Sequence, residues 1–530
     1  MTSQSRRLIL AAIFATTALA FSRAFDSGYV TWDDDRLVLH NLFIGMPFGQ
    51  AMRGIWSHSY DGDYLPIPFL SYWLEVKAFG FDPVPQHVVN LLLHLLNVSL
   101  MYLWLSRLRV AAGVVIILTL VFALHPVQTE SVMWIGERKG LLAVSFLLLG
   151  LLAFERATAS PSRWLRWTVA WTVCFALSCL CKTIGVLLPF VFVFYSRWIE
   201  RKSWRDTLRP NVGAGVVATM FAVLQFKVYA AAVPQGGTAA FGLERLPILI
   251  PMIVTAIGHY LVSIFYPLNL SILYAPFQQF PHRTINFVLG GLYLGVLARS
   301  VIRRERAPEV FLGLWSLALL LPTIPRFNFV NDRYLYLPIV GIGGFLSSLV
   351  LSSWRSARES LAWRVIGVCV GIVIAALTFA QSKIWEDSLT LWTATVRHVP
   401  QMQLALTSLG VAQLEAGRPT EAEQSFVKAT KVASQESARP YIDLAAIYMA
   451  RHQPMDAQRI LLEGLPFAYL PEERFAVKYS TGLVQLQLKQ RSAAARTFSE
   501  LLQEMKNWSS NAYNLRLEQQ VRDMLSAVDR

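Results

Sequence analysis

Long apolar runs recur through the first 380 residues, and they constrain the fold more than any other feature of the sequence. Of the 530 residues, 54% are hydrophobic and only 15% are charged, whereas about 25% of the residues in a soluble domain are charged. A run of about 18 apolar residues is long enough to cross a bilayer as a helix. The pattern therefore predicts an all-α, polytopic membrane protein with about 11 to 13 spans.

The basic charge and the cysteines fit the same class. A net charge of +14 would also suit a nucleic-acid-binding protein, but much of the excess lies in short loops between predicted spans, which is typical of membrane orientation. Four cysteines occur, all in or beside apolar runs. Their position argues against a disulfide framework and against a thiolate metal site. We therefore expect no nucleic-acid partner.

The first apolar run, residues 8–21, allows two interpretations. It follows a basic start and contains a small-residue site, so it could be a cleaved signal peptide. Because many more spans follow, we favour an uncleaved first helix whose N-terminus is cytoplasmic. The next stretch then lies outside the cytoplasm, at the mouth of the bilayer.

That stretch contains three consecutive carboxylates, Asp33, Asp34 and Asp35. Carboxylates at this depth are costly unless they line a water-filled cavity or meet a partner. They indicate a general base or part of a cation site. The alternative is a helix N-cap, since Asp stabilises the positive end of a helix.

The segment 26–86 is half polar and rich in aromatic residues, so we expect a long external loop with short helices on the membrane surface. A second span is expected at 87–106. In it His87, Asn90 and His94 are spaced by three and four, which places them on one helix face. They could contact a ligand, but for His94 hydrogen bonding between helices is the favoured interpretation.

A dense polar hinge follows the third predicted span, 110–124. It begins at His125, includes Glu130, and ends in Glu137-Arg138-Lys139. Guanidinium and ammonium groups are the side chains that hold phosphates. Lys182 falls in a later external hairpin, and Arg333 lies in a polar loop before the span at 334–353, so both are predicted at the same membrane face.

The span count presents one difficulty, at residues 246–266. Simple crossings at 212–232 and 246–266 would make Arg299–Arg306 external, although its charge is typical of a cytoplasmic loop. We therefore expect 246–266 to be a re-entrant or surface-lying element, which is tolerated where it lines a cavity. A hidden extra crossing is the competing solution.

The composition changes after residue 384, where the chain becomes charged and rich in alanine. Small and aromatic residues recur with a period of about 34, as in tetratricopeptide repeats; they are Leu409, Gly410, Ala422 and Phe426, then Leu444, Ala445, Tyr448, Ala457 and Leu461, then Gly482, Ala494 and Phe498. We predict a membrane domain at 1–384 and an α-solenoid of helical repeats at 385–530. The repeats could bind a peptide, or could serve packing or dimerisation.

With these motifs in view, the chain resembles the transmembrane and tetratricopeptide-repeat-containing O-mannosyltransferase family, as a bacterial-type member of the GT-C superfamily. The resemblance covers nearly the whole chain and rests on the order and spacing of five motifs: Tyr29–Asp34, Tyr64–Pro66, His87–His94, His125–Lys139 and Asp332–Pro338. Two positions depart from the family pattern. Asp35 stands where relatives often have proline, and Thr183 follows Lys182 where many have glutamate.

The resemblance implies transfer of a sugar, expected to be mannose, from a polyprenyl- or dolichyl-phosphate donor to a hydroxyl, expected on Ser or Thr of an exported protein. Asp34 is the first choice for the base and Asp33 the second. Arg138, Lys139, Lys182 and Arg333 are expected to bind the donor phosphate. The supporting or substrate-contacting residues are Tyr64, His87, His125, Glu130, Glu137, Asp332 and Tyr334. No cofactor is required, although a divalent cation at Asp33 and Asp34 stays open.

The implied location is a bacterial inner membrane, with the site and the repeats facing the periplasm; in a eukaryote it is the endoplasmic reticulum membrane. The expected partners are the lipid donor, a protein or glycan acceptor that the repeats could bind, and membrane lipids. A transporter or flippase, or a non-catalytic scaffold for the repeats, are the competing functions. A transporter should bury ionisable groups at mid-span, and the predicted spans have few.

Overall fold

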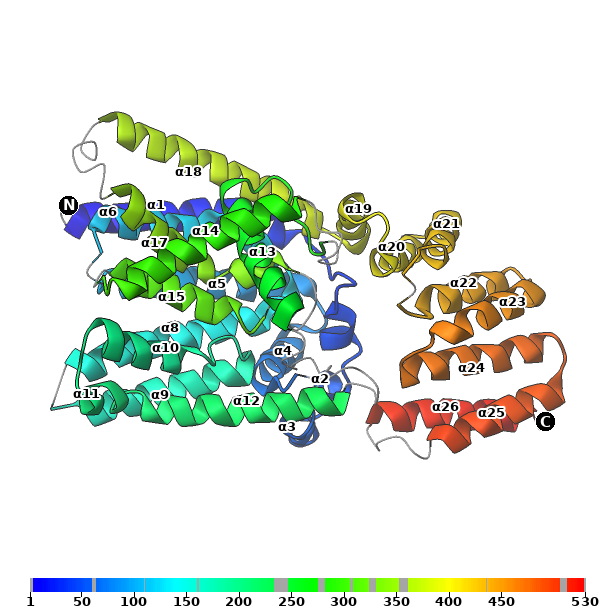
Figure 1. The fold of residues 1–530 in the computed structure, drawn as a ribbon. Coiled ribbons are helices and arrows are strands. Elements are labelled where there is room, and N and C mark those ends of the chain that lie inside the picture. Colours follow the sequence, from blue (N-terminus) through cyan, green and yellow to red (C-terminus); the bar gives the residue numbers. More distant parts are fainter. Residues whose placement is uncertain are drawn as a thin grey trace. The chain divides into compact units, whose positions relative to one another are not determined.

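The computed structural model describes residues 3–59, 63–108, 110–159, 162–232, 246–274, 282–305, 308–323, 330–351, 361–434, 436–505 and 512–528. The elements formed by these residues are all helices (Figure 1). The chain divides into two compact units, Met1–Asp387 and Ser388–Arg530. The predicted all-α class is confirmed.

Six segments of the first unit are long and apolar enough to cross a membrane. They are Pro83–Leu105 (α5), Ile135–Ala159 (η4 and α8), Trp164–Cys181 (α9), Pro247–Phe265 in α13, Arg283–Ile302 (α14) and Gly367–Trp385 (α18 and η9). A bent pair, Ala112–Leu124 (α6) with Pro126–Met133, can make a seventh. The shorter apolar helices are Arg7–Ala20, Leu188–Ile199, Val212–Val228, Pro308–Leu320 and Pro338–Leu349. The chain is an integral, multi-pass membrane protein.

The helix α8 (Arg138–Ala159) defines two ends of this bundle. Its 22 residues span about 33 Å, which is close to the thickness of a bilayer core. The helix α9 packs beside α8 and runs back, so Lys182 returns to the end where Arg138 lies (Figure 1). We call this the hinge end, because residues 125–138 form it, and we call the opposite end, with the α8–α9 turn, the basic end.

Helix α13 (Leu246–Phe265) corrects the expectation of a re-entrant element. It is one continuous helix, with Pro251 inside it, and it runs antiparallel to α14. Glycines let the two backbones meet: a Cβ on Gly258 would lie 1.7 Å from the Asn286 carbonyl oxygen, and one on Gly290 would lie 1.9 Å from that of Val254. His125 donates to the Ile264 carbonyl oxygen at 2.9 Å, so α13 ends at the hinge end. The preceding segment, 233–245, lies outside the described residues.

The first loop contains the short helices that its sequence predicts. They are η2 (Asp35–Leu39), α2 (Leu42–Gly45), α3 (Phe48–Ser57) and α4 (Pro66–Phe79). Buried apolar side chains from these helices pack with Ile135 of the hinge. The loop is therefore a folded layer held against the hinge end of the bundle.

The second unit consists of antiparallel helix pairs. Three of them are α20–α21 (Gln403–Glu415, Pro419–Thr430), α22–α23 (Arg439–Ala450, Pro454–Gly464) and α24–α25 (Pro471–Gln487, Arg491–Met505). Gly410 faces the ring of Phe426, and Gly482 faces that of Phe498, each too closely for a Cβ. The small and aromatic residues of the repeat pattern thus meet within their own helix pairs, as helical repeats require.

Candidate functional site

Asp34 joins the first loop to the hinge. Its side chain is fully buried. Its Oδ2 accepts from the Val30 backbone N–H at 3.0 Å, and its Oδ1 accepts from the Gly136 N–H at 2.9 Å. Burial raises the pKa of Asp34 to about 8, although the two N–H groups act in the opposite direction. The Asp34 carboxyl therefore connects the first loop to the hinge, through a hydrogen bond between residues that are 102 positions apart in the sequence.

Asp33 is in a different situation, because its side chain is half-buried and has access to the surface. Its backbone is left-handed, with a φ of 72°, a conformation that Asp and Asn tolerate better than most residues. The residue after it is fixed by the hinge. Asp33 is therefore held in a constrained position, and it is partly exposed.

The ring of Trp134 lies at the centre of the hinge end. The ammonium of Lys139 lies 5.2 Å from its centroid, and the guanidinium of Arg333 lies 5.4 Å from it. Trp32 and Trp385 pack against the same ring at centroid distances of 6.1 and 6.4 Å. Trp32 is the neighbour of Asp33 and also lies 6.0 Å from the Arg333 guanidinium. The early acidic segment and the later cationic loops therefore converge, as the sequence predicts.

Two buried ion pairs hold these loops together. Arg333 Nη1 donates to Glu130 Oε1 at 2.5 Å, and the Arg333 backbone N–H donates to Oε2 at 2.8 Å. Lys182 pairs with Glu137. Lys182 and Arg333 also lie 5.6 and 5.0 Å from the Tyr334 ring. We call Glu130, Glu137, Lys139, Lys182 and Arg333 the hinge cluster.

The two paired cations of the hinge cluster respond differently to burial. Burial lowers the pKa of Lys182, and Glu137 offsets part of that effect. Burial would also lower the pKa of Arg333, but the adjacent Glu130 outweighs it and raises that pKa above its usual value. Lys139 is half-buried, and among the described residues no carboxylate forms an ion pair with it. With three cations and two carboxylates, the cluster has one positive charge in excess.

Arg138 does not take the role that its sequence position suggests. Its side chain is fully buried and pairs with Glu75. It also donates to Asn90, to Ser71 at 2.8 Å and to the Gln86 carbonyl oxygen at 2.7 Å. All of its N–H-bearing nitrogens are engaged in joining α4, α5 and α8, which argues against the predicted phosphate contact.

Several predicted supporting residues hold the backbone in place. His87 lies 3.1 Å from the Gly28 carbonyl oxygen, and the hydroxyl of Tyr64 donates to the Trp56 carbonyl oxygen at 2.9 Å within the first loop. His125 connects the hinge to α13. His94 bonds to Tyr336 and to the Ala123 carbonyl oxygen, which confirms the favoured interpretation of hydrogen bonding between helices.

Asp332 anchors the loop that carries Arg333. Its carboxyl accepts from the Tyr274 hydroxyl at 2.8 and 3.0 Å and from the Ser271 backbone N–H at 3.2 Å. Burial raises the pKa of Asp332 well above its usual value, and Glu130 adds to the effect. Asp332 is a buried structural residue. Its neighbour Arg333 belongs to the hinge cluster, and the ring of Tyr334 contacts that cluster.

Asp33 and Asp34 are the residues at which the sequence leaves a divalent cation open. Within the described part of the chain, no three His, Cys, Asp or Glu side chains lie close enough to hold an ion. Both oxygens of Asp34 already accept backbone N–H groups.

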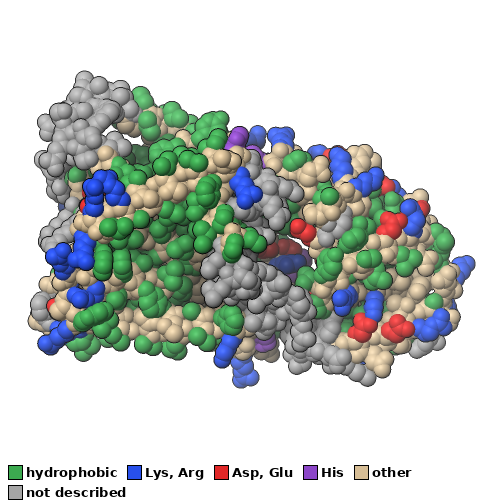
Figure 2. All heavy atoms as spheres, viewed as in Figure 1, with side chains coloured by type: hydrophobic (Ala, Val, Ile, Leu, Met, Phe, Trp, Pro, Cys, Tyr) green, Lys and Arg blue, Asp and Glu red, His purple; other side chains and the backbone are tan. Residues whose placement is uncertain are grey.

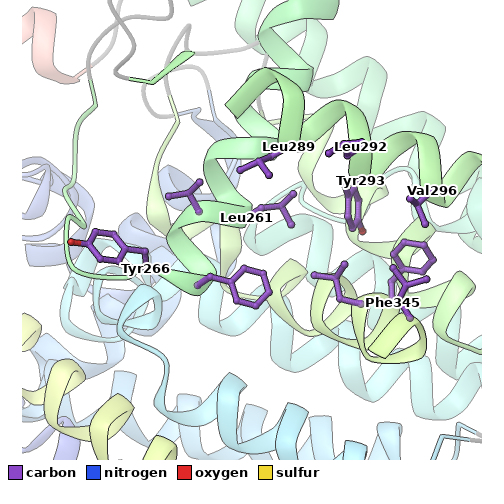
Figure 3. Close-up of a pocket in the computed structure, with 11 residues that line it drawn as sticks. Leu261, Tyr266, Leu289, Leu292, Tyr293, Val296 and Phe345 are labelled. Atoms are coloured by element: carbon purple, nitrogen blue, oxygen red, sulfur yellow. The ribbon is translucent and has the colours of Figure 1, made fainter. Parts of the chain in front are cut away.

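An apolar cavity of about 410 Å³ lies between α13, α14 and α17 (Pro338–Leu351) (Figure 3). Leu261, Leu289, Leu292, Tyr293, Val296 and Phe345 are among its lining residues. Phe265 and Tyr266 line its end beside Ile264, whose carbonyl oxygen binds His125. The cavity is open to the outside of the bundle, since its lining residues Phe265, Leu292 and Tyr266 are exposed, and one end of it adjoins the hinge.

Sequence reasoning missed three residues that organise this region. Trp134 was inside the hinge motif but was not singled out, although an indole among cations is a signal for cation–π contacts. Glu75 is an isolated carboxylate in an apolar helix, which predicts a buried partner, here Arg138. Tyr274 has no such signal, because only the folded chain brings it to Asp332.

These features define a class: a polytopic helical membrane protein with helical repeats and a charged site at one end of its bundle. The human protein O-mannosyl-transferase TMTC3 is 23% identical to the chain over 488 residues, which cover 81% of this chain and 51% of that protein. Mouse protein O-mannosyl-transferase TMTC4 is 30% identical over 203 residues, or 32% and 26% of the two chains. Mouse protein O-mannosyl-transferase TMTC1 is 32% identical over 117 residues, or 22% and 12%.

The chain is thus homologous to protein O-mannosyl-transferases of the TMTC type, which is the resemblance that its motifs predict. It spans about half the length of TMTC3. No family model matches it, and no solved structure matches it.

Proposed function

We propose that the chain is a membrane glycosyltransferase that moves mannose from a polyprenyl-phosphate donor to a hydroxyl of an exported protein. The observation that carries the proposal is the convergence of the Asp33 segment with Lys139 and Arg333 around Trp134. Transfer needs a base for the acceptor hydroxyl and fixed cations for the departing phosphate. Both kinds of group lie at the hinge end.

The charge of the hinge cluster fits the donor. A polyprenyl-phosphate sugar is a phosphodiester with one negative charge, and the cluster has one positive charge in excess. As the glycosidic bond breaks, the leaving phosphate gains a second negative charge, which the cations stabilise more strongly than they stabilise the donor. Lys139 is the cation we expect to contact the phosphate first, because Lys182 and Arg333 already have carboxylate partners.

The difference in burial of the two carboxyls supports Asp33 over Asp34 as the base. Asp33 is partly exposed, whereas Asp34 is fully enclosed with both oxygens bonded to the backbone. We therefore assign the base to Asp33 and the positioning of Asp33 to Asp34, which reverses the order that the sequence favoured. Proton removal by Asp33 accompanies attack of the hydroxyl on the sugar carbon, through an oxocarbenium-like state by analogy with glycoside hydrolysis.

The apolar cavity supplies a place for the polyprenyl chain. Its volume of about 410 Å³ lies in the range of small-molecule sites, and the end lined by Phe265 and Tyr266 adjoins the hinge, where Ile264 bonds to His125. A chain lying between α13, α14 and α17 would present its phosphate at the hinge end. This placement assigns the hinge end to the extracytoplasmic side, because the opposite end has the arginine-rich loops of a cytoplasmic face.

Incubation of the purified chain with radiolabelled polyprenyl-phosphate mannose and a Ser/Thr-rich acceptor peptide tests the proposal. Release of polyprenyl phosphate with label on the peptide is the expected result, and the Asp33→Asn variant should lose it. Movement of the donor across liposomes without any transfer would instead support the flippase alternative. Peptide binding with neither activity would support a scaffold.

A further inference from the structure

Four arginines gather at the basic end, far from the hinge cluster. Arg156 lies near the end of α8, Arg163 and Arg166 flank the start of α9, and Arg209 follows α11 (Trp204–Leu208). Figure 2 shows Lys and Arg side chains along this end of the first unit, next to a broad hydrophobic face. We call these four residues the arginine cluster.

Two tryptophans of α9 organise the arginine cluster. The guanidinium of Arg209 lies 3.7 Å from the Trp164 ring centroid, and those of Arg156 and Arg166 lie 4.6 and 5.4 Å from the Trp167 centroid. A guanidinium stacked on an aromatic face keeps its N–H edge free for bidentate bonds to a phosphate. Tryptophan itself settles at the level of lipid headgroups.

Among the described carboxylates, Glu155 interacts electrostatically with one member of this cluster, Arg156. Among the described residues, no carboxylate forms an ion pair with any of its four members. The nearby Glu155 pairs with Arg107 at 3.7 Å. The three guanidinium groups that stack on these tryptophans repel one another, and a bound anion relieves that repulsion.

An apolar surface begins directly beside the arginine cluster. On α9, Leu165, Val169 and Val173 are 58%, 52% and 50% exposed, and their spacing of four residues places them along one face. On the adjacent helix α12 (Val212–Ala232), Val212, Val216 and Met220 form a second exposed row. A soluble phosphate would leave these apolar rows exposed, whereas the acyl chains of a lipid would cover them.

We infer that the arginine cluster is a headgroup site for an anionic glycerophospholipid, whose acyl chains lie along the exposed rows of α9 and α12. The site fixes the basic end in the anionic leaflet of the membrane, to which such clusters are attracted. It does not depend on sugar transfer, because it lies at the other end of the bundle.

Native mass spectrometry of the full chain, purified in detergent with equal amounts of phosphatidylglycerol and phosphatidylcholine, tests this inference. We expect selective retention of phosphatidylglycerol, and a loss of its apparent affinity of about tenfold or more in the R156Q/R166Q/R209Q variant. The matched control R201Q/R205Q/R303Q removes the same charge from the same end without touching the stacked arginines, and should retain the lipid within about twofold. The variant R156K/R166K/R209K, which keeps the charge but not the planar fork, should fall between the two.

Equal losses in the triple variant and its control would overturn the inference, since they would indicate diffuse attraction only. Full displacement of the lipid by inorganic phosphate would also overturn it, in favour of a soluble anion. Size-exclusion profiles report folding, and if the triple variant misfolds, the single exposed R166Q replaces it with an expected loss of about fivefold. An unchanged affinity in R166Q would then contradict the site.

Discussion

At the scale of single residues, the two neighbouring aspartates lie in different surroundings, and the separate roles that we propose for them rest on that difference. Asp33 faces the surface from a left-handed backbone, and Asp34 is enclosed by the N–H groups of Val30 and Gly136. Sequence alone could not separate them, since both belong to one acidic run. The difference depends on Gly136, which the fold brings to Asp34.

The first prediction compares Asn at the two positions. Asp33→Asn should abolish sugar transfer while leaving thermal stability nearly unchanged, because Asn tolerates a positive φ. Asp34→Asn should destabilise the chain by about 1–3 kcal/mol, since its NH₂ group would face a buried backbone donor. Transfer assays and thermal unfolding followed by tryptophan fluorescence measure both effects. An active D33N variant would refute the base assignment.

The second prediction concerns the pH dependence of stability. The pKa of Asp34 is about 8 in the folded chain, against an ordinary value of 3.8. Between these values the folded chain holds a proton that the unfolded chain has lost, so stability falls as the pH rises, by up to about 1.4 kcal/mol per pH unit, and levels off above pH 8. Thermal unfolding of the wild-type chain should show this slope from pH 5 to 8 (about one proton), and D34N should lack it. If stability changed with pH in the same way in the wild-type chain and in D34N, the raised pKa of Asp34 would be contradicted.

At the scale of elements, the contact between α13 and α14 depends on two glycines. The hydrophobic pattern identified both helices but could not reveal how they pair, because the close approach is made by residues without side chains. The expected re-entrant element followed from counting crossings, and crossings are fixed by connections that the pattern does not show. The first-loop helices and the repeat pairs can be predicted from the sequence, since apolar spacing and turn residues mark them locally.

A third prediction tests the helix contact. Gly258→Val should destabilise the chain strongly, because its side chain would collide with the Asn286 backbone of α14. Gly295→Val on α14 is the matched control, since nothing lies within 4 Å of a Cβ there. In thermal unfolding in detergent, we expect Gly258→Val to lower the melting temperature and Gly295→Val to leave it nearly unchanged. Equal melting temperatures would show that the helices do not approach as described.

At the scale of the molecule, the two ends of the bundle have different chemistry. The hinge end has three cations and two carboxylates around Trp134, and the basic end has arginines that stack on tryptophans and form no ion pair within the described residues. The sequence predicted the loops that contribute to each end, since charge marks them. It could not predict that Arg138 is buried against Glu75 while Lys139, one residue later, stays accessible, because that choice depends on the rotation of α8 against α4 and α5.

A fourth prediction connects the cavity to the donor. Leu292→Trp should fill part of the space between α13, α14 and α17 and raise the KM for a long-chain polyprenyl-phosphate mannose about tenfold. A donor with only two isoprene units should be used as well as by the wild-type chain. The control Ile302→Trp lies on α14 outside the cavity and is also exposed. An equal change in KM for both donors would contradict binding of the polyprenyl chain in this cavity.

The most direct measurement is a cryo-EM structure of the full chain with a polyprenyl-phosphate mannose bound. We predict that the donor phosphate lies within hydrogen-bonding distance of Lys139 and beside Arg333, with the first carbon of the sugar facing Asp33. Donor density at the basic end, or a phosphate at the hinge end with the sugar turned away from Asp33, would contradict the account.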